Sequence, residues 1–233
     1  MHANSRRISS NQRHLHPRLA TEVRKHLQTR YLRPVARHNR VAYRQLQAAL
    51  DQCARPLVLD SFCGTGQSTA ELARRHPHHL VVGIDKSAAR LARHARSDTE
   101  NYLLLQADCA DIWQLLAQDG LDVERHYLLY PNPWPKAAHL QRRVHGHPSF
   151  PLLLHLAQRA GGYVEVRSNW QLYVEEFGVA MHLSGSPGRV GRIGAAPPIT
   201  LFERKYLRSG HDLWAFTAQI KGSVRRDELA VIG

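Results

Sequence analysis

The sequence predicts an α/β fold: a mostly parallel seven-stranded sheet with helices on both faces and a C-terminal antiparallel hairpin. Short apolar runs such as 57–59 and 80–84 alternate with helix-like segments from residue 57 onward. Two more strand-like segments, 199–207 and 212–220, flank a Ser-Gly turn near the end of the sequence. The apolar fraction of 43% in 233 residues is sufficient for one sizeable core.

Five strands precede the hairpin, and each is a short apolar run that ends near Gly, Asp, Asn or Pro. We expect these strands at 57–59, 80–84, 102–105, 126–130 and 162–166. Longer segments with helical periodicity lie between and after them, at 67–76, 87–96, 111–118, 150–159 and 170–182. Asp111 is expected to cap the third of these helices. The segment 184–198 is rich in Gly, Ser, Ala and Pro and is expected to be a mobile loop.

The first 50 residues carry most of the net charge. They hold eleven Lys and Arg but one acidic residue, Glu22, and so contribute +10 of the formal +13. A helical pattern begins near Pro17 and is broken at Pro34. We therefore expect a basic helical arm at 1–50 and the main domain at 51–233. A polyanion would neutralise such an arm, although a solubilising tail or the codon bias of a GC-rich genome would give the same composition.

Several classes of protein are disfavoured by the sequence. No apolar run approaches the length of a membrane span, and the N-terminus lacks the apolar segment of a signal peptide. The three cysteines have no paired spacing, and no zinc signature is present, so no metal site is expected. We expect a cytoplasmic protein with reduced thiols, no membrane contact and a monomeric state.

Candidate cofactor residues follow three consecutive strands. Asp60 ends the first strand and is followed by Gly64 and Gly66, which let backbone approach a ligand closely. Asp85 ends the second strand, where a carboxylate can accept both hydroxyls of a ribose, and Asp108 ends the third, near an adenine edge. The sequence has neither a P-loop nor a strict Gly-x-Gly-x-x-Gly motif. A nucleoside cofactor without phosphates, S-adenosyl-L-methionine, therefore fits better than NAD or ATP.

Later motifs carry a sharper resemblance. In order they are Pro131-Asn132-Pro133-Trp134-Pro135-Lys136 with His139, Arg142 and Arg143, then Ser168-Asn169-Trp170 with Tyr173, then Thr200-Leu201-Phe202-Glu203. They resemble the Pro-Asp-Pro-Trp-Pro-Lys…His…Arg-Arg, Thr-Asp-Trp…Tyr and Thr-x-x-Glu motifs of the tRNA (guanine-N7)-methyltransferases, and the resemblance covers roughly 57–220. It implies a divergent member of that family, with the Rossmann-like fold of class I S-adenosylmethionine-dependent methyltransferases.

The resemblance also implies roles for individual residues. Asp60, Gly64 and Gly66 would lie against the methionine part of the cofactor, Asp85 against its ribose and Asp108 against its adenine. Asn132 would lie between cofactor and target base, as the catalytic residue. Four residues would hold the substrate guanosine of the tRNA variable loop: Lys136, Asn169, Thr200 and Glu203. Three would approach phosphates: His139, Arg142 and Arg143.

Some positions depart from the family pattern. Phe62 replaces a glycine of the first loop, Asn132 and Asn169 replace aspartates, and Ala137-Ala138 replace a Lys-Arg pair. An asparagine accepts at its oxygen but also donates through its NH₂ group, so the two asparagines change the hydrogen bonds offered to the target base. Two alternatives to guanine N7 methylation stay open. Asn132-Pro133-Trp134 resembles the Asn-Pro-Pro-aromatic motif of amino-methyltransferases, and a divergent paralogue could bind RNA without turnover.

Overall fold

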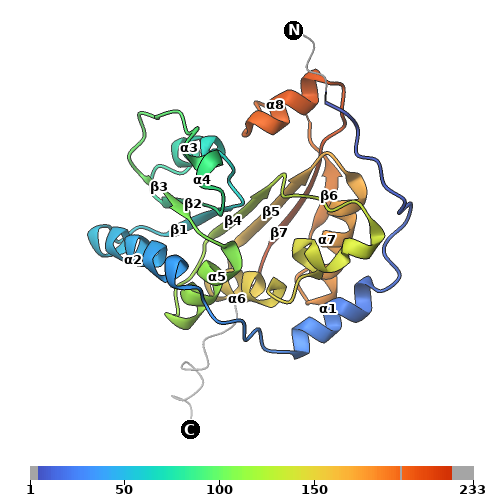
Figure 1. The fold of residues 1–233 in the computed structure, drawn as a ribbon, viewed down its shortest axis with the longest axis horizontal. Coiled ribbons are helices and arrows are strands. Elements are labelled where there is room, and N and C mark those ends of the chain that lie inside the picture. The colour runs from blue at the N-terminus through green and yellow to red at the C-terminus, as the bar shows by residue number, and fades with distance from the viewer. Residues whose placement is uncertain (1–4, 195, 222–233) are drawn as a thin grey trace.

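The computed structural model describes residues 5–194 and 196–221. Its centre is a seven-stranded sheet in the order β3-β2-β1-β4-β5-β7-β6 (Figure 1). All pairs are parallel except those of β7, which is antiparallel to both β5 and β6. The strands are β1 (Leu57–Ser61), β2 (Leu80–Asp85), β3 (Tyr102–Gln106), β4 (Arg125–Leu129), β5 (Tyr163–Ser168), β6 (Arg189–Arg192) and β7 (Trp214–Gln219). This confirms the predicted fold class.

Helices lie on both faces of the sheet because neighbouring residues of each strand point to opposite sides. Val58 and Val81 pack with Leu72 of α3 on one face. Leu59 and Val82 belong to the larger core on the other face, which includes residues of α5, α6 and α7. The helices are α1 (Leu19–Gln28), α2 (Arg37–Gln52), α3 (Gln67–Arg75), α4 (Ala88–Leu91), α5 (Cys109–Gln118), α6 (Phe150–Ala160), α7 (Gln171–Leu183) and α8 (Leu201–Arg208), with short 3₁₀ turns η1 (Ala137–Arg142) and η2 (Val144–Gly146).

The C-terminal hairpin differs from the prediction. The strand paired with β7 is β6, which lies inside the segment 184–198 that we expected to be a loop. The segment 199–207, expected to be a strand, instead forms α8. The side chain of Thr200 accepts a hydrogen bond from the backbone N–H of Glu203, and this cap starts the helix. The helix expected at 87–96 is also shorter, because α4 ends at Leu91.

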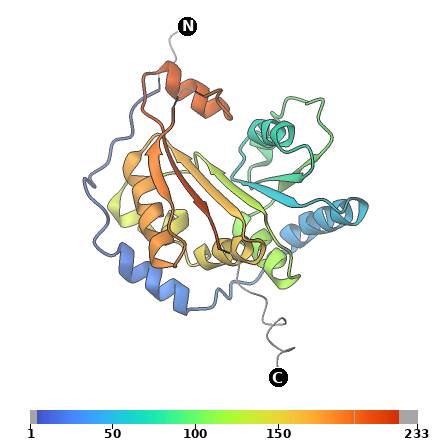
Figure 2. The same ribbon diagram turned by 180° about the vertical axis from the view of Figure 1, so that it is seen from behind.

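The N-terminal arm is folded onto the main domain. It runs along one side of the molecule from beside α8 to α1 and then passes below the sheet to α2 (Figures 1 and 2). Leu19 and Val23 of α1 and Leu46 of α2 are buried in the same core as the sheet. The two helices and the break at Pro34 agree with the sequence pattern. Within residues 5–194 and 196–221, no helix combines the length and apolar character needed to cross a membrane.

Candidate active site

The loop after β1 has a backbone that favours glycine. Phe62, Gly64 and Gly66 have φ angles of 65°, 64° and 75°, all in the left-handed region. A Cβ atom on Gly66 would lie 2.6 Å from the side chain of Leu104, so a larger residue would have to displace that side chain. The backbone N–H of Gly64 donates to Asp85 Oδ2 at 3.0 Å. The loop is therefore tied to the end of β2 and leads directly into the N-terminus of α3.

Asp60 lies below this loop and is fully buried. Its Oδ2 accepts hydrogen bonds from the hydroxyls of Ser68 (2.6 Å) and Thr69 (2.7 Å) at the start of α3. Its Oδ1 is buried and has no hydrogen-bond partner among the described residues. Burial raises the pKa of the Asp60 carboxyl to about 6, although the two hydroxyls oppose this shift. Asp60 thus has one oxygen without a protein donor in the described part of the chain, although the residue does not line the cavity beside Asp85.

Asp85 and Asp108 line one cavity at the carboxyl ends of the strands. The Asp85 carboxylate accepts from the backbone N–H groups of Gly64 and Ser87, and its Oδ2 lies 3.3 Å from Arg90. Asp108 caps α5 by accepting from the N–H of Ala110 at 3.0 Å. Both carboxylates are therefore held in place by neighbouring N–H groups while they face the cavity.

The expectation that Asp111 caps α5 was wrong, because Asp108 is the cap. Asp111 is fully buried, and its Oδ2 accepts from the N–H of Ala36 and the amide of Asn39. These two residues belong to the arm, so Asp111 anchors the start of α2 against the main domain.

The same cavity, of about 370 Å³, extends to the loop that follows β4. Its lining combines residues from the first loop (Phe62, Gly64), the ends of β2 and β3 (Asp85, Lys86, Arg90, Ala107, Asp108, Cys109), the loop after β4 (Tyr130, Pro131, Asn132, Pro133, Trp134, Arg142, Val144) and α8 (Phe202, Tyr206). Of the predicted cofactor residues, Gly64, Asp85, Asp108 and Asn132 therefore share one cavity, whereas Asp60 and Gly66 do not line it. Phe202 and Tyr206 were missed by sequence reasoning. Two aromatic residues four positions apart on an amphipathic segment were the available signal.

The loop after β4, residues 130–143, is called the acceptor loop below. Tyr130 and Trp134 have φ angles of 57° and 45°, which non-glycine residues rarely adopt. Asn132 is exposed, lines the cavity, and accepts from the N–H of Trp134 at 3.3 Å. Arg142 is exposed, with its guanidinium 4.8 Å from the centre of the Trp134 ring. Lys136 is also exposed, and His139 contacts the edge of the Trp134 ring.

Arg143 does not have the expected position. We predicted that it approaches phosphates, but its side chain is fully buried. Its Nη1 pairs with Glu176, and its Nε and Nη2 each donate to the carbonyl oxygen of Trp134 at 3.2 Å. A buried arginine that makes these bonds is unavailable to solvent and to RNA. It supports the acceptor loop from inside the protein.

Glu203, Thr200 and Asn169 do not line the cavity. Glu203 is 2% exposed, and it accepts from Arg167 Nη1 and from the N–H of Ile199, both at 2.7 Å. Thr200 is buried and caps α8. The amide Nδ2 of Asn169 lies 3.1 Å from Nδ1 of His211. In this structure Glu203 and Thr200 therefore fix α8, whose residues Phe202 and Tyr206 face the cavity.

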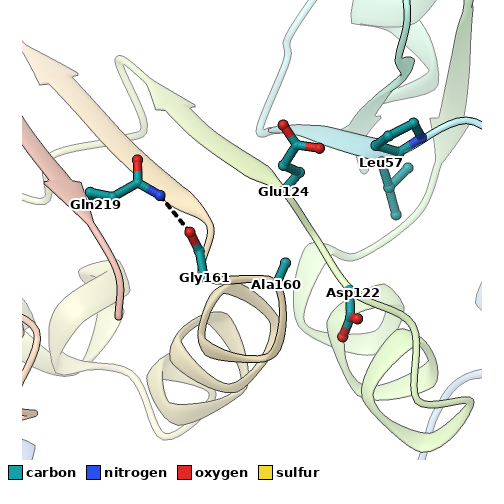
Figure 3. Close-up of a pocket in the computed structure, with 7 residues that line it drawn as sticks. Leu57, Asp122, Glu124, Ala160, Gly161 and Gln219 are labelled. Atoms are coloured by element: carbon teal, nitrogen blue, oxygen red, sulfur yellow. Dashed lines mark hydrogen bonds between the residues drawn. The ribbon is translucent and has the colours of Figure 1, made fainter. Parts of the chain in front are cut away.

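A second pocket lies at the opposite edge of the sheet, where the parallel strands begin. Asp122, Glu124 and Gly161 line it, together with Gln219 from the end of β7 (Figure 3). The amide of Gln219 donates to the carbonyl oxygen of Gly161, which closes one side of the pocket. No candidate cofactor or substrate residue reaches this edge. In open α/β sheets ligands bind at the carboxyl ends, so the cavity beside Asp85 is the candidate active site.

Comparisons with known proteins point in the same direction. A family model described as "Putative methyltransferase" matches residues 54–215. The tRNA (guanine-N(7)-)-methyltransferase of Paraburkholderia xenovorans strain LB400 is 30% identical over 178 residues, which cover 72% of this chain and 67% of that protein. The enzyme of the same name from Nitrosospira multiformis is 31% identical over 170 residues, covering 68% of this chain and 72% of that protein. The chain thus spans about two thirds of the length of these relatives.

Solved structures show the fold. The antibiotic-resistance methyltransferase Kmr has a TM-score of 0.51 at 20% identity and covers 77% of this chain and 92% of its own. The 16S rRNA methyltransferase KamB has a TM-score of 0.51 at 20% identity and covers 82% of this chain and 97% of its own. Both support a Rossmann-like methyltransferase architecture for the described residues.

Proposed function

We propose, from the premise that this chain belongs to the tRNA (guanine-N7)-methyltransferase family, that it transfers a methyl group from S-adenosyl-L-methionine to N7 of a guanine in tRNA. The observation that carries the proposal is the single cavity shared by Asp85, Asp108 and Asn132. It joins a surface suited to a nucleoside cofactor with the loop expected to face the target base. A methyl group could pass between the two ligands within this cavity.

The residues present fit S-adenosyl-L-methionine. Asp60 does not line the cavity, but its Oδ1 has no donor among the described residues. We propose that it accepts from the ammonium group of the methionine part beside the glycine loop, which allows close approach of backbone at Gly64. Asp85 would accept the ribose hydroxyls, and Asp108, which lines the same cavity, would lie beside the adenine. The bound cofactor would supply a methyl group on a positively charged sulfur atom, which a neutral nucleophile can accept directly.

Guanine N7 has a lone pair and carries no proton, so this transfer requires no general base. The new bond joins N7 to the methyl carbon, the bond from that carbon to sulfur breaks, and the positive charge passes to the purine ring. The task of the protein is then to align the base and exclude water. Asn132 would orient the base, and the exposed ring of Phe202 would stack on it or on the neighbouring base.

Exposed positive charge supports tRNA as the substrate. Lys136 and Arg142 lie on the acceptor loop, and α2 exposes Arg40 and Arg44 one turn apart. Because the helices of the arm belong to the core, charge reversal is a cleaner test than deletion. Arg40→Glu with Arg44→Glu should weaken tRNA binding and reduce its salt slope by about 0.9 for each phosphate that the protein no longer neutralises. An unchanged slope would indicate that these arginines contribute to solubility and do not contact tRNA.

We further propose that the protein acts in the cytoplasm as a monomer.

The test of the reaction is methyl transfer from labelled S-adenosyl-L-methionine to unmodified tRNA transcripts, followed by nucleoside analysis. We expect 7-methylguanosine from the wild type. Asn132→Asp should preserve or raise the rate, because Asn132 removes no proton. Asn169→Asp is a matched control, since Asn169 also replaces a family aspartate but does not line the cavity. A wild-type product methylated on an exocyclic amine, or activity abolished by Asn132→Asp, would overturn the assignment to guanine N7 and favour the amino-methyltransferase alternative. No transfer by any of these proteins would favour the non-catalytic paralogue.

A further inference from the structure

The acceptor loop is contacted by a segment near the start of the sequence, residues 10–16, which we call the strap. The hydroxyl of Ser10 donates to the carbonyl oxygen of Pro135. The side-chain oxygen of Asn11 accepts from the backbone N–H of Ala137 at 3.3 Å. Both hydrogen bonds involve backbone groups of the loop, so they constrain its conformation whatever side chains it carries.

Gln12 connects the strap to the buried ion pair between Arg143 and Glu176. Its Oε1 accepts from Arg143 Nη2 at 2.9 Å, and its Nε2 donates to Glu176 Oε1 at 2.6 Å. The backbone N–H of His16 donates to the same Glu176 oxygen at 2.7 Å. The other Glu176 oxygen pairs with Arg143 and lies 3.2 Å from Nε2 of His145. The strap therefore supplies hydrogen bonds to both members of this buried ion pair.

Arg143 connects the strap to the acceptor loop at Trp134. Its guanidinium donates two bonds to the carbonyl oxygen of Trp134 and lies 5.0 Å from the centre of the Trp170 ring. Trp134 has a left-handed backbone, which persists only when the surrounding structure enforces it. Its N–H is the group bonded to the side chain of Asn132. A chain of direct interactions thus runs from Gln12 through Arg143 and Trp134 to the residue expected to face the target base.

We propose that Gln12 is a positioning residue for methyl transfer, and that the strap therefore contributes to turnover and not only to tRNA binding. The proposal rests on the proposed function for its activity readout. Gln12 does not line the cavity, so it acts through Arg143. A small displacement of a reacting group costs up to about 10²-fold in rate. We therefore expect that removing one of the hydrogen bonds that hold Arg143 lowers kcat about tenfold.

The experiment compares Gln12→Ala with Gln47→Ala in the full chain. Gln47 is a matched control, because its amide also bonds a carboxylate of the main domain, Asp119, at 3.0 Å, but away from the cavity. We expect Gln12→Ala to lower kcat about tenfold at saturating tRNA, with KM for tRNA and its salt dependence within about twofold of wild type. Hydrogen exchange of the backbone amides in residues 130–143 should be faster than in the wild type for Gln12→Ala but not for Gln47→Ala.

Two outcomes would overturn the proposal. The first is unchanged kcat and unchanged exchange in residues 130–143. The second is a loss confined to KM and the salt slope, which would make the strap a phosphate-binding segment. If the wild type transfers no methyl group to tRNA, the proposed function fails, but the exchange measurement still decides whether Gln12 holds the acceptor loop.

Discussion

Replacing Asp60 with asparagine should abolish a pH dependence of cofactor binding that the wild type shows below about pH 6. Burial raises the pKa of the Asp60 carboxyl to about 6, so the free protein binds a proton there in mild acid. The ammonium group of S-adenosylhomocysteine near the unpartnered Oδ1 would favour the ionised carboxylate. Binding below pH 6 therefore has to release this proton, and affinity should rise as the pH rises.

The magnitude follows from the two pKa values. If the ammonium group returns the pKa of Asp60 to its ordinary value of about 4, the free protein at pH 5 is about nine-tenths protonated and the complex about nine-tenths ionised. Affinity at pH 5 should then be about tenfold weaker than at pH 8, a difference of about 1.4 kcal/mol. The ligand-free protein should also lose stability as the pH rises from about 4 to 6, because its folded state holds a proton that the unfolded chain releases.

Calorimetric titration with S-adenosylhomocysteine between pH 5 and 8 measures this effect. The wild type should show the tenfold change, and Asp60→Asn should show a flat profile. Asp111→Asn is the control, because Asp111 is also a fully buried carboxylate with an unpartnered Oδ1, but its hydrogen bonds go to Ala36 and Asn39 of the arm and not to the start of α3. A flat wild-type profile, or the same slope in Asp60→Asn as in the wild type, would refute the reasoning.

Three further predictions concern Phe62, Glu176 and Phe202. Because φ is 65° at Phe62, Phe62→Gly should be more stable than Phe62→Ala by about 1 kcal/mol in urea unfolding; equal stabilities would show that the loop is unstrained. Burial opposes ionisation of Glu176, but His145 and Arg143 outweigh it and lower the pKa to about 2. The unfolding free energy should therefore fall as the pH drops from about 4.5 to about 2, and circular dichroism of Glu176→Gln should lack this component. Phe202→Ala should raise KM for tRNA about tenfold, whereas Leu201→Ala, which truncates a side chain that is also 48% exposed, should not; equal effects would exclude stacking by Phe202.

The parallel part of the sheet was predictable because strand ends are local features. Asp60, Asp85 and Asp108 each follow an apolar run, and parallel strands bring such ends to one edge. The helix at 201–208 was predictable too, since Thr200-x-x-Glu203 has the sequence pattern of a capping box, although the Glu203 carboxylate accepts from the N–H of Ile199 and not from that of Thr200. The strand expected at 199–207 came instead from its place before the Ser209-Gly210 turn, and the substrate role of Thr200 and Glu203 came from the family resemblance.

The burial of Arg143 was not predictable. Arg142 and Arg143 are neighbours of the same type, yet one lies exposed over Trp134 and the other is buried against Glu176, 33 positions later in the chain. No local pattern distinguishes them, because their environments depend on how α7 packs below the acceptor loop. The hydrogen bonds from the strap to Arg143 and Glu176 could not be predicted either, because they also join residues far apart in the sequence.

The bond between Gln12 and Glu176 joins residues 164 positions apart, and this distance has a consequence for synthesis. At about 5–20 residues per second, a ribosome makes Glu176 about 10–30 seconds after Gln12. Trp134 and Arg143 are made in the interval, before α7 exists to receive them. The first three strands, with Asp60, Asp85 and Asp108, are complete earlier still. A nascent chain therefore holds the parts of its cofactor surface well before its acceptor loop can be ordered, and the capacity to modify RNA arises only late in translation.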